Sequence, residues 1–75
     1  MERRVRRVRD VPIREDEIRL GQFLKLAGLA ASGAEAKLLL QDGAVTVNGA
    51  VEERRGRKLR RGDEVALGDD AARVA

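Results

Sequence analysis

The residues of this 75-residue chain that could do chemistry are mostly cations, and they are clustered. Six of the eight residues at 54–61 are Lys or Arg, and five arginines lie within residues 3–9. The formal net charge is +3, while several carboxylates gather elsewhere, at 15–17, 52–53 and 69–70. Lys and Arg side chains bind phosphate groups through charge-assisted hydrogen bonds. This separation of charge predicts a polyanionic partner, met by one continuous electropositive surface that includes residues 54–61.

Catalytic side chains are scarce. The chain has no histidine to act as a base near neutral pH and no cysteine to act as a nucleophile. Its only serine, Ser32, has the position of a helix cap, and Asp69-Asp70 lies in a glycine turn, where adjacent carboxylates are typically solvated. The sequence has no phosphate-binding P-loop and no dinucleotide motif. We therefore expect no enzymatic activity, no cofactor, no metal site and no small-molecule substrate.

Length and hydropathy bound the class of protein. Seventy-five residues make one domain with a small core. We assign residues 1–9 to a basic, mobile N-terminal arm and residues 10–75 to a single domain. No apolar run approaches the roughly 20 residues that span a bilayer, and no apolar stretch follows the N-terminal arginines as in a signal peptide. The sequence therefore predicts a cytoplasmic monomer that does not enter a membrane.

The first helix is predicted from its apolar spacing. Residues 14–17 are polar and indicate a turn. From residue 18 onward, apolar residues recur three and four apart, at Leu20, Phe23, Leu24 and Ala27. Gly28 suits the left-handed position that follows a helix. Gly21 is unfavourable inside a helix, so it indicates close packing at that position.

A second helix is expected after a short turn. Ser32 and Glu35 have the spacing of a capping box, in which the serine oxygen accepts from the Glu35 amide and the carboxylate accepts from the Ser32 amide. The helix then runs to about Asp42 and ends at Gly43. Its core face carries Ala36, Leu39 and Leu40 with Leu38 at the margin, and its exposed face carries Lys37 and Gln41.

Short strands are expected in the second half of the chain. Residues 45–47 alternate between apolar and polar, and Asn48-Gly49 is typical of a hairpin loop. We predict a three-residue loop over 48–50, which keeps Val47 and Val51 on the same inward face. Other strand positions are 10–13 (an edge strand, because Pro12 lacks a backbone donor), Leu59, Val65, Leu67 and 72–74. The expected fold is α+β, with two packed helices followed by a small antiparallel β-sheet.

The order of these segments resembles the S4 RNA-binding domain family. The matching residues are Arg19-Leu20, Phe23-Leu24, Ser32, Ala36, the run at 43–49, Gly62-Asp63 and Val65. Segments at 22–28, 32–37 and 52–59 are most similar to small stand-alone S4-like proteins of bacteria. The resemblance implies an S4-like (alpha-L) motif. It also implies a translation-associated protein that binds structured RNA, with ribosomal or transfer RNA as the ligand class and the ribosome as a candidate partner.

One departure from the family pattern concerns the start of the second helix. Many S4 domains carry arginines there that meet RNA phosphates, whereas residues 30–34 of this chain carry no charge. The backbone amides of the helix N-terminus are still open to a phosphate, although Glu35 opposes it. The only aromatic residue, Phe23, falls on a core face, so base stacking on aromatic rings is not expected. Recognition is therefore predicted through phosphate contacts and RNA shape.

We predict that RNA meets one basic surface. Its cations neutralise phosphates, whereas Asn48 is expected chiefly to hold its turn. The predicted contact residues are Lys25, Lys37, Gln41, Asn48, Arg54, Arg55, Arg57, Lys58, Arg60 and Arg61. The arginines within 3–9 are either a contact arm or a solubilising tail. The alternative functions are a protein-interaction adaptor that docks through its helices and a DNA-binding module, since phosphate contacts alone do not separate RNA from DNA.

Overall fold

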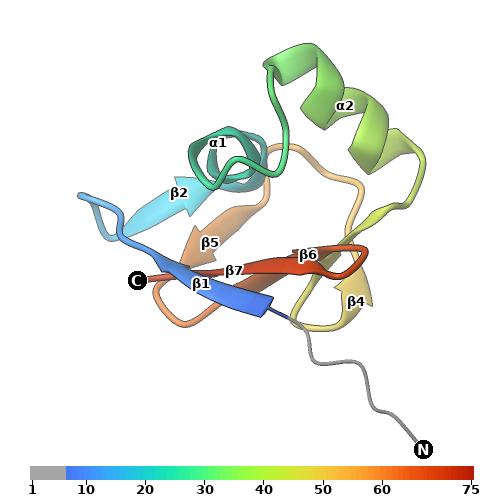
Figure 1. The fold of residues 1–75 in the computed structure, drawn as a ribbon. Coiled ribbons are helices and arrows are strands. Elements are labelled where there is room, and N and C mark those ends of the chain that lie inside the picture. The colour runs from blue at the N-terminus through green and yellow to red at the C-terminus, as the bar shows by residue number, and fades with distance from the viewer. Residues whose placement is uncertain (1–6) are drawn as a thin grey trace, which may run out of the picture.

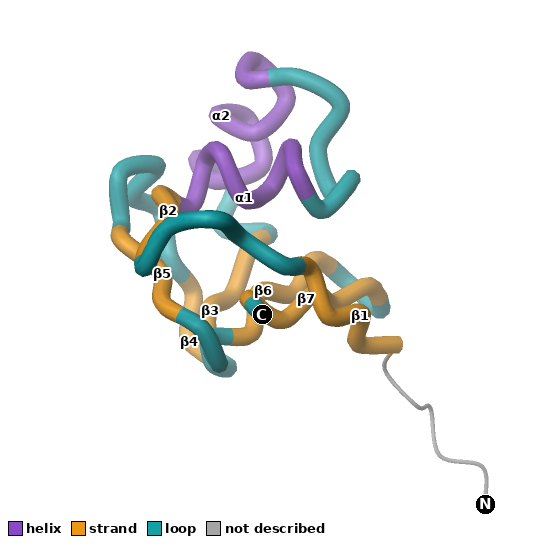
Figure 2. The backbone as a smooth tube through the Cα atoms, turned by 90° about the vertical axis from the view of Figure 1, so that its left-hand side faces the viewer, coloured by secondary structure: helices purple, strands orange, loops and turns teal. Residues whose placement is uncertain are grey.

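Two short helices and seven strands make up residues 7–75, the part of the chain that the computed structural model describes (Figure 1). Both helices lie on the same side of a five-stranded sheet, and a separate two-stranded sheet lies near α1 (Figures 1 and 2). The predicted α+β class is confirmed. The elements are β1 (Arg7–Val11), β2 (Glu17–Arg19), α1 (Leu20–Leu26), α2 (Gly33–Gln41), β3 (Val45–Val47), β4 (Ala50–Val51), β5 (Lys58–Arg60), β6 (Glu64–Leu67) and β7 (Asp70–Val74).

The five-stranded sheet has the order β1-β7-β6-β3-β4 and is mixed. Strand β1 runs parallel to β7, whereas the other neighbours are antiparallel. The prediction of an antiparallel sheet after the helices is therefore wrong for β1, which precedes the helices. Residues 7–9 belong to this strand and not to the predicted arm, because they pair with the last strand of the chain. Residues 1–6 of the predicted arm lie outside the described residues.

Strand β2 of the two-stranded sheet occupies residues 17–19. The sequence predicted a turn at 14–17 and a helix from residue 18, so the helix begins later than predicted. Strand β2 pairs with β5, and its half-buried middle residue lies opposite the buried Leu59. Helix α1 then begins at Leu20. Leu20 N donates to Arg57 O (2.8 Å) and Gly21 N donates to Arg55 O (2.9 Å). The helix start is thus set by carbonyls of a distant loop, which satisfy amides that have no partner within the helix.

Helix ends follow local signals in the sequence. Gly28 (φ +75°) and Gly43 (φ +70°) take the left-handed positions after α1 and α2, as predicted. Ser32 Oγ accepts from the Glu35 amide (3.1 Å), which confirms one half of the capping box. The other half is wrong, because the Glu35 carboxylate accepts from Ala31 N (2.6 Å). The Glu35 carboxylate therefore satisfies the amide of the residue before the cap.

The β3–β4 hairpin has a two-residue loop. Val47 pairs with Ala50, so the loop consists of Asn48 (φ +52°) and Gly49 (φ +89°). The predicted three-residue loop is wrong, and Val51 faces away from the core with 60% of its surface exposed. The reason is turn chemistry: Asn-Gly with two positive φ angles matches the twist of the flanking strands in a tight hairpin.

The core lies between the helices and the inner face of the sheet. It is aliphatic apart from Phe23, which is fully buried as predicted. Leu39 is only partly buried, and Leu38, placed at the margin of the helix face, is exposed. The largest fully buried side chains are Phe23, Leu20, Leu24, Leu40, Leu59, Val45, Val47, Val65 and Val74. Within residues 7–75, neither helix is long and apolar enough to cross a membrane.

Candidate nucleic-acid interface

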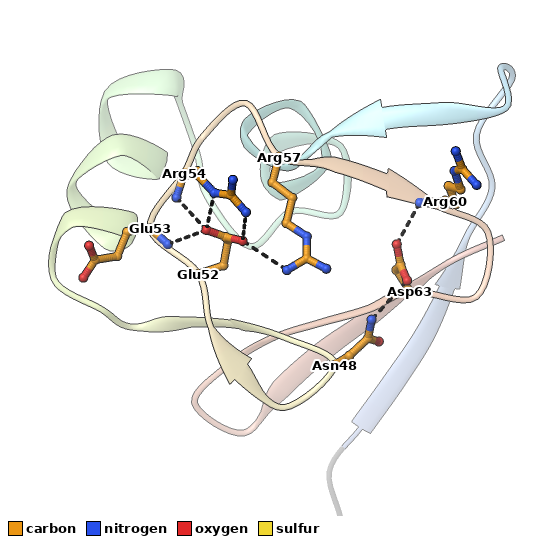
Figure 3. A network of polar contacts seen from close by, with 7 residues as sticks. All are labelled: Asn48, Glu52, Glu53, Arg54, Arg57, Arg60 and Asp63. Carbon is orange, nitrogen blue, oxygen red and sulfur yellow. Dashed lines mark hydrogen bonds and ion pairs between the residues drawn. The ribbon is translucent and has the colours of Figure 1, made fainter.

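Glu52 organises the basic loop between β4 and β5. The residue is 7% exposed, and its carboxylate accepts five hydrogen bonds (Figure 3). The amides of Glu53 and Arg54 donate to Oε2 at 3.1 and 3.0 Å. The Arg54 guanidinium donates to both oxygens (3.2 and 3.3 Å), and Arg57 Nη1 donates to Oε1 (3.0 Å). Two of the predicted contact residues therefore converge on one carboxylate.

This network keeps Glu52 charged. The side-chain hydrogen bond from Arg54 is the largest cause that lowers the pKa of Glu52 to about 2, followed by the Arg54 amide. Burial acts in the opposite direction, because it disfavours a charged carboxylate, and a further hydrogen bond from Arg57 adds to the lowering. At neutral pH the carboxylate is thus fully ionised and fixes the conformation of residues 52–57.

The loop packs against helix α1 at Gly21. Besides the backbone hydrogen bond from Gly21 N to Arg55 O, the Arg55 side chain lies directly over the glycine. A Cβ atom at Gly21 would collide with Arg55 Cγ and lie 3.1 Å from Arg55 Cδ. The close packing predicted from a glycine inside the helix is confirmed. It allows Arg55 to lie across α1.

A groove of about 500 Å³ runs between α1, the first turns of α2 and the Arg55-Gly56 turn. Arg19 is held at its rim, where Nη1 donates to Gly56 O (3.2 Å). Within the described residues, none of the residues that line this groove is a carboxylate, and the side chains of Lys25 and Arg55 have no ion-pair partner. The lining consists of Arg19, Gly21, Gln22, Lys25, Gly33, Ala36, Arg55 and Gly56. We call this site the cationic groove.

The far end of the basic run is charge-paired. Lys58 Nζ lies 3.5 Å from Glu17 Oε2, and Arg61 Nη1 lies 3.7 Å from Asp16 Oδ1. Arg61 Nη2 also donates to Ile13 O (2.9 Å). Carboxylates therefore lie beside Lys58 and Arg61, and the continuous electropositive surface over residues 54–61 stays a prediction. The acidic residues of the 15–17 segment, distant in the sequence, are brought beside the cations by the pairing of β2 with β5.

Asp63, in the turn before β6, accepts hydrogen bonds from the Asn48 side chain and from the Arg60 amide (Figure 3). Asn48 Nδ2 donates to Asp63 Oδ1 (3.0 Å), and Asn48 Oδ1 accepts from Glu64 N (2.9 Å). Burial raises the pKa of Asp63, but hydrogen bonds from the Arg60 amide and the Asn48 side chain outweigh it and leave the pKa lowered. Asn48 thus holds its turn against the neighbouring one, as expected. The Arg60 side chain is exposed.

The predicted contact residues are therefore only partly brought together. Lys25 and Arg55 share the cationic groove, whereas Lys37 and Gln41 are exposed on α2 and do not line it. Their contact with RNA stays a prediction. Two groove residues, Arg19 and Gln22, were missed. The sequence shows Arg19 just before the first helix, but the position of its side chain depends on a hydrogen bond to Gly56, 37 residues away. No local sequence pattern reveals that contact.

Most of this chain is similar in sequence to known proteins. Residues 11–75 match the family model of the S4 domain. A protein of Bacillus subtilis (strain 168), "Probable ribosome maturation protein RlbA", is 47% identical over 57 residues, which are 76% of this chain and 80% of that protein. "Putative RNA-binding protein YbcJ" of Escherichia coli (strain K12) is 39% identical over 57 residues, 76% of this chain and 81% of that protein. The family match includes both helices, the loop at 52–57 and the entire cationic groove.

Proposed function

Because this chain belongs to the S4 domain family, we propose that it binds structured RNA through the cationic groove and catalyses no reaction on it. The observation that carries the proposal is the groove itself, in which three cations converge and no described residue of the lining is a carboxylate. Arg19 Nη1 donates to Gly56 O, and the aliphatic part of the Arg55 side chain packs over Gly21. Preorganised cations lose little conformational freedom when they meet a phosphate, which favours affinity.

The groove suits phosphate contacts better than base stacking. Phe23, the only aromatic residue, is fully buried, so no aromatic ring is offered to a base. Guanidinium groups bind phosphate oxygens with two parallel hydrogen bonds, and the sugar 2′-hydroxyl gives a polar side chain such as Gln22 a group that only RNA carries. We therefore place phosphates at Arg19, Lys25 and Arg55, with Gln22 beside the sugar.

Ribosomal RNA is the ligand class that we favour, ahead of transfer RNA. The support is the name of the Bacillus subtilis relative, which refers to ribosome maturation, and the name of the Escherichia coli relative, which refers to RNA binding. The chain would then act in the cytoplasm as a monomer. Lys37 and Gln41, exposed on α2, are outer contacts in this proposal, and Arg60 is a further exposed candidate away from the groove.

The test is a salt titration with bacterial ribosomal RNA and single variants. Arg19→Gln, Lys25→Gln and Arg55→Gln should each weaken binding and reduce the slope of log K against log salt by roughly 0.7–0.9, the value of one lost phosphate contact. Arg14→Gln is the matched control, because Arg14 is exposed and does not line the cationic groove. Groove variants that behave like Arg14→Gln would refute the site.

The same titration separates the rival functions. An adaptor that docks through apolar contacts would show binding that depends little on salt. A DNA-binding module would bind a DNA duplex as tightly as an RNA duplex of the same sequence and length. Preference for RNA is expected here, since the 2′-hydroxyl and the A-form shape are absent from DNA.

A further inference from the structure

The β2–β5 ladder joins an acidic segment to a basic strand. Its register places Glu17 opposite Arg60 and Arg19 opposite Lys58, so the acidic end of β2 lies beside the C-terminal end of β5. The ladder therefore has two electrostatically different ends. At one end, Arg19 leads into the cationic groove, and at the other the 15–17 segment meets the last cations of the basic run.

The cations that lie beside the acidic segment also differ from those of the groove in what they contact. Lys58 and Arg61 each have a carboxylate within 4 Å, from Glu17 at 3.5 Å and from Asp16 at 3.7 Å. Arg61 is further held toward this segment by its hydrogen bond to Ile13 O. In the described chain, the cations of the groove have no such carboxylate.

We propose that Asp16 and Glu17 are built-in counter-ions that occupy Lys58 and Arg61 and thereby confine RNA phosphates to the cationic groove. This inference rests on the proposed function. A phosphate that approaches Lys58 must replace a carboxylate that already neutralises it, so the exchange gains little attraction. Salt-dependent affinity for nucleic acids arises when protein cations neutralise phosphates. A cation that is already neutralised by a carboxylate adds little to this affinity.

The counter-ions make binding selective. Affinity for an arbitrary polyanion depends chiefly on how many phosphates the protein neutralises, whereas a fitted RNA also gains from shape and from the groove. Neutralising two exposed cations therefore weakens non-specific binding more than specific binding. Discrimination of this kind is achieved by opposing the wrong partner, and not only by attracting the right one.

Charge-matched variants test the proposal. Asp16→Asn with Glu17→Gln frees both cations, whereas Glu15→Gln with Glu53→Gln changes the net charge equally. The control side chains are exposed and form no ion pair within residues 7–75. Each protein is titrated with a DNA duplex as the non-specific probe and with bacterial ribosomal RNA, at several salt concentrations.

For the freed cations, the DNA slope of log K against log salt should steepen by about 1.8, or about 0.9 per added phosphate contact. The ratio of RNA affinity to DNA affinity should fall. The control pair should leave the slope near that of the wild type. Equal slopes for the two variants would overturn the proposal.

A second variant does not touch the acidic residues. Lys58→Gln with Arg61→Gln should leave the salt slope of the wild-type protein unchanged, because these cations are already neutralised. A slope reduced by about 1.8 would mean that they bind phosphates freely and would overturn the proposal. Failure of the proposed function has a different result, in which wild-type protein shows no salt-dependent preference for ribosomal RNA over DNA.

Discussion

Replacing Glu52 by glutamine tests the idea that one buried carboxylate fixes the basic loop. Glutamine keeps the size of the side chain and one oxygen acceptor, but it removes the charge that Arg54 and Arg57 contact. The five hydrogen bonds to this carboxylate cannot all be kept, because the amide group brings donors of its own toward two guanidinium groups.

The expected loss of stability follows from the pKa of Glu52. A fall from 4.5 to about 2 corresponds to about 3 kcal/mol of differential stabilisation of the charged form, at about 1.36 kcal/mol per pKa unit. Solvent screens this interaction, since the Arg54 side chain is 78% exposed. We therefore expect Glu52→Gln to lower the free energy of unfolding by about 1–2 kcal/mol at pH 7.

The pH dependence has a definite sign. A carboxyl group whose pKa is lowered on folding contributes stability above its unfolded pKa, and this contribution disappears as pH falls through the folded pKa. The stability difference between wild type and Glu52→Gln should therefore be constant above about pH 5 and shrink toward pH 2. Other carboxyl groups titrate in both proteins and largely cancel in the difference.

Urea unfolding followed by circular dichroism, at several pH values, measures this difference. Glu53→Gln is the control, because Glu53 is the neighbouring glutamate, is exposed, and its substitution removes the same charge. The reasoning is refuted if Glu52→Gln is as stable as the control, or if its deficit does not change with pH.

Three further substitutions have outcomes set by local geometry, each measured by urea unfolding. Gly21→Ala should lower stability by about 1–2 kcal/mol, because overpacking against Arg55 exceeds the gain in helix propensity, and it should also weaken ribosomal RNA binding. Ser32→Ala should lose about 1 kcal/mol through the missing cap to the Glu35 amide, with RNA binding unchanged. Asn48→Ala should lose about 2 kcal/mol, because it removes two hydrogen bonds and leaves an alanine at positive φ.

Features decided by neighbouring residues were predictable from the sequence. Gly28 and Gly43 end the helices because a left-handed residue is needed next to the last turn, and Ser32 begins α2 because its oxygen reaches an amide three residues on. The hairpin shows how two local signals compete. The inward-facing valine pattern favoured a three-residue loop, but the backbone preference of Asn48-Gly49 prevailed.

Features decided by distant residues were not predictable in this way. Nothing near β1 in the sequence indicates its parallel partner β7, which is the last strand of the described chain. Glu52 looks like one more acidic residue before a basic run, and only its burial makes it the centre of the loop. Arg19 likewise gains its position from the carbonyl of Gly56. The basic segments are therefore evident in the sequence, whereas the groove that they help to form depends on contacts between distant residues.

Availability, and not number, decides what the cations of the basic run can bind. Arg54 and Arg57 contact a buried carboxylate that accepts five hydrogen bonds. A phosphate that bound these guanidinium groups fully would have to break their hydrogen bonds to Glu52. Lys58 and Arg61 each lie beside a carboxylate of the 15–17 segment, which a phosphate would have to displace. Arg55 has neither kind of partner among the described residues, and it lies in the groove. A net charge of +3 therefore says little about affinity, which should follow the few cations that fold into the groove without a carboxylate beside them.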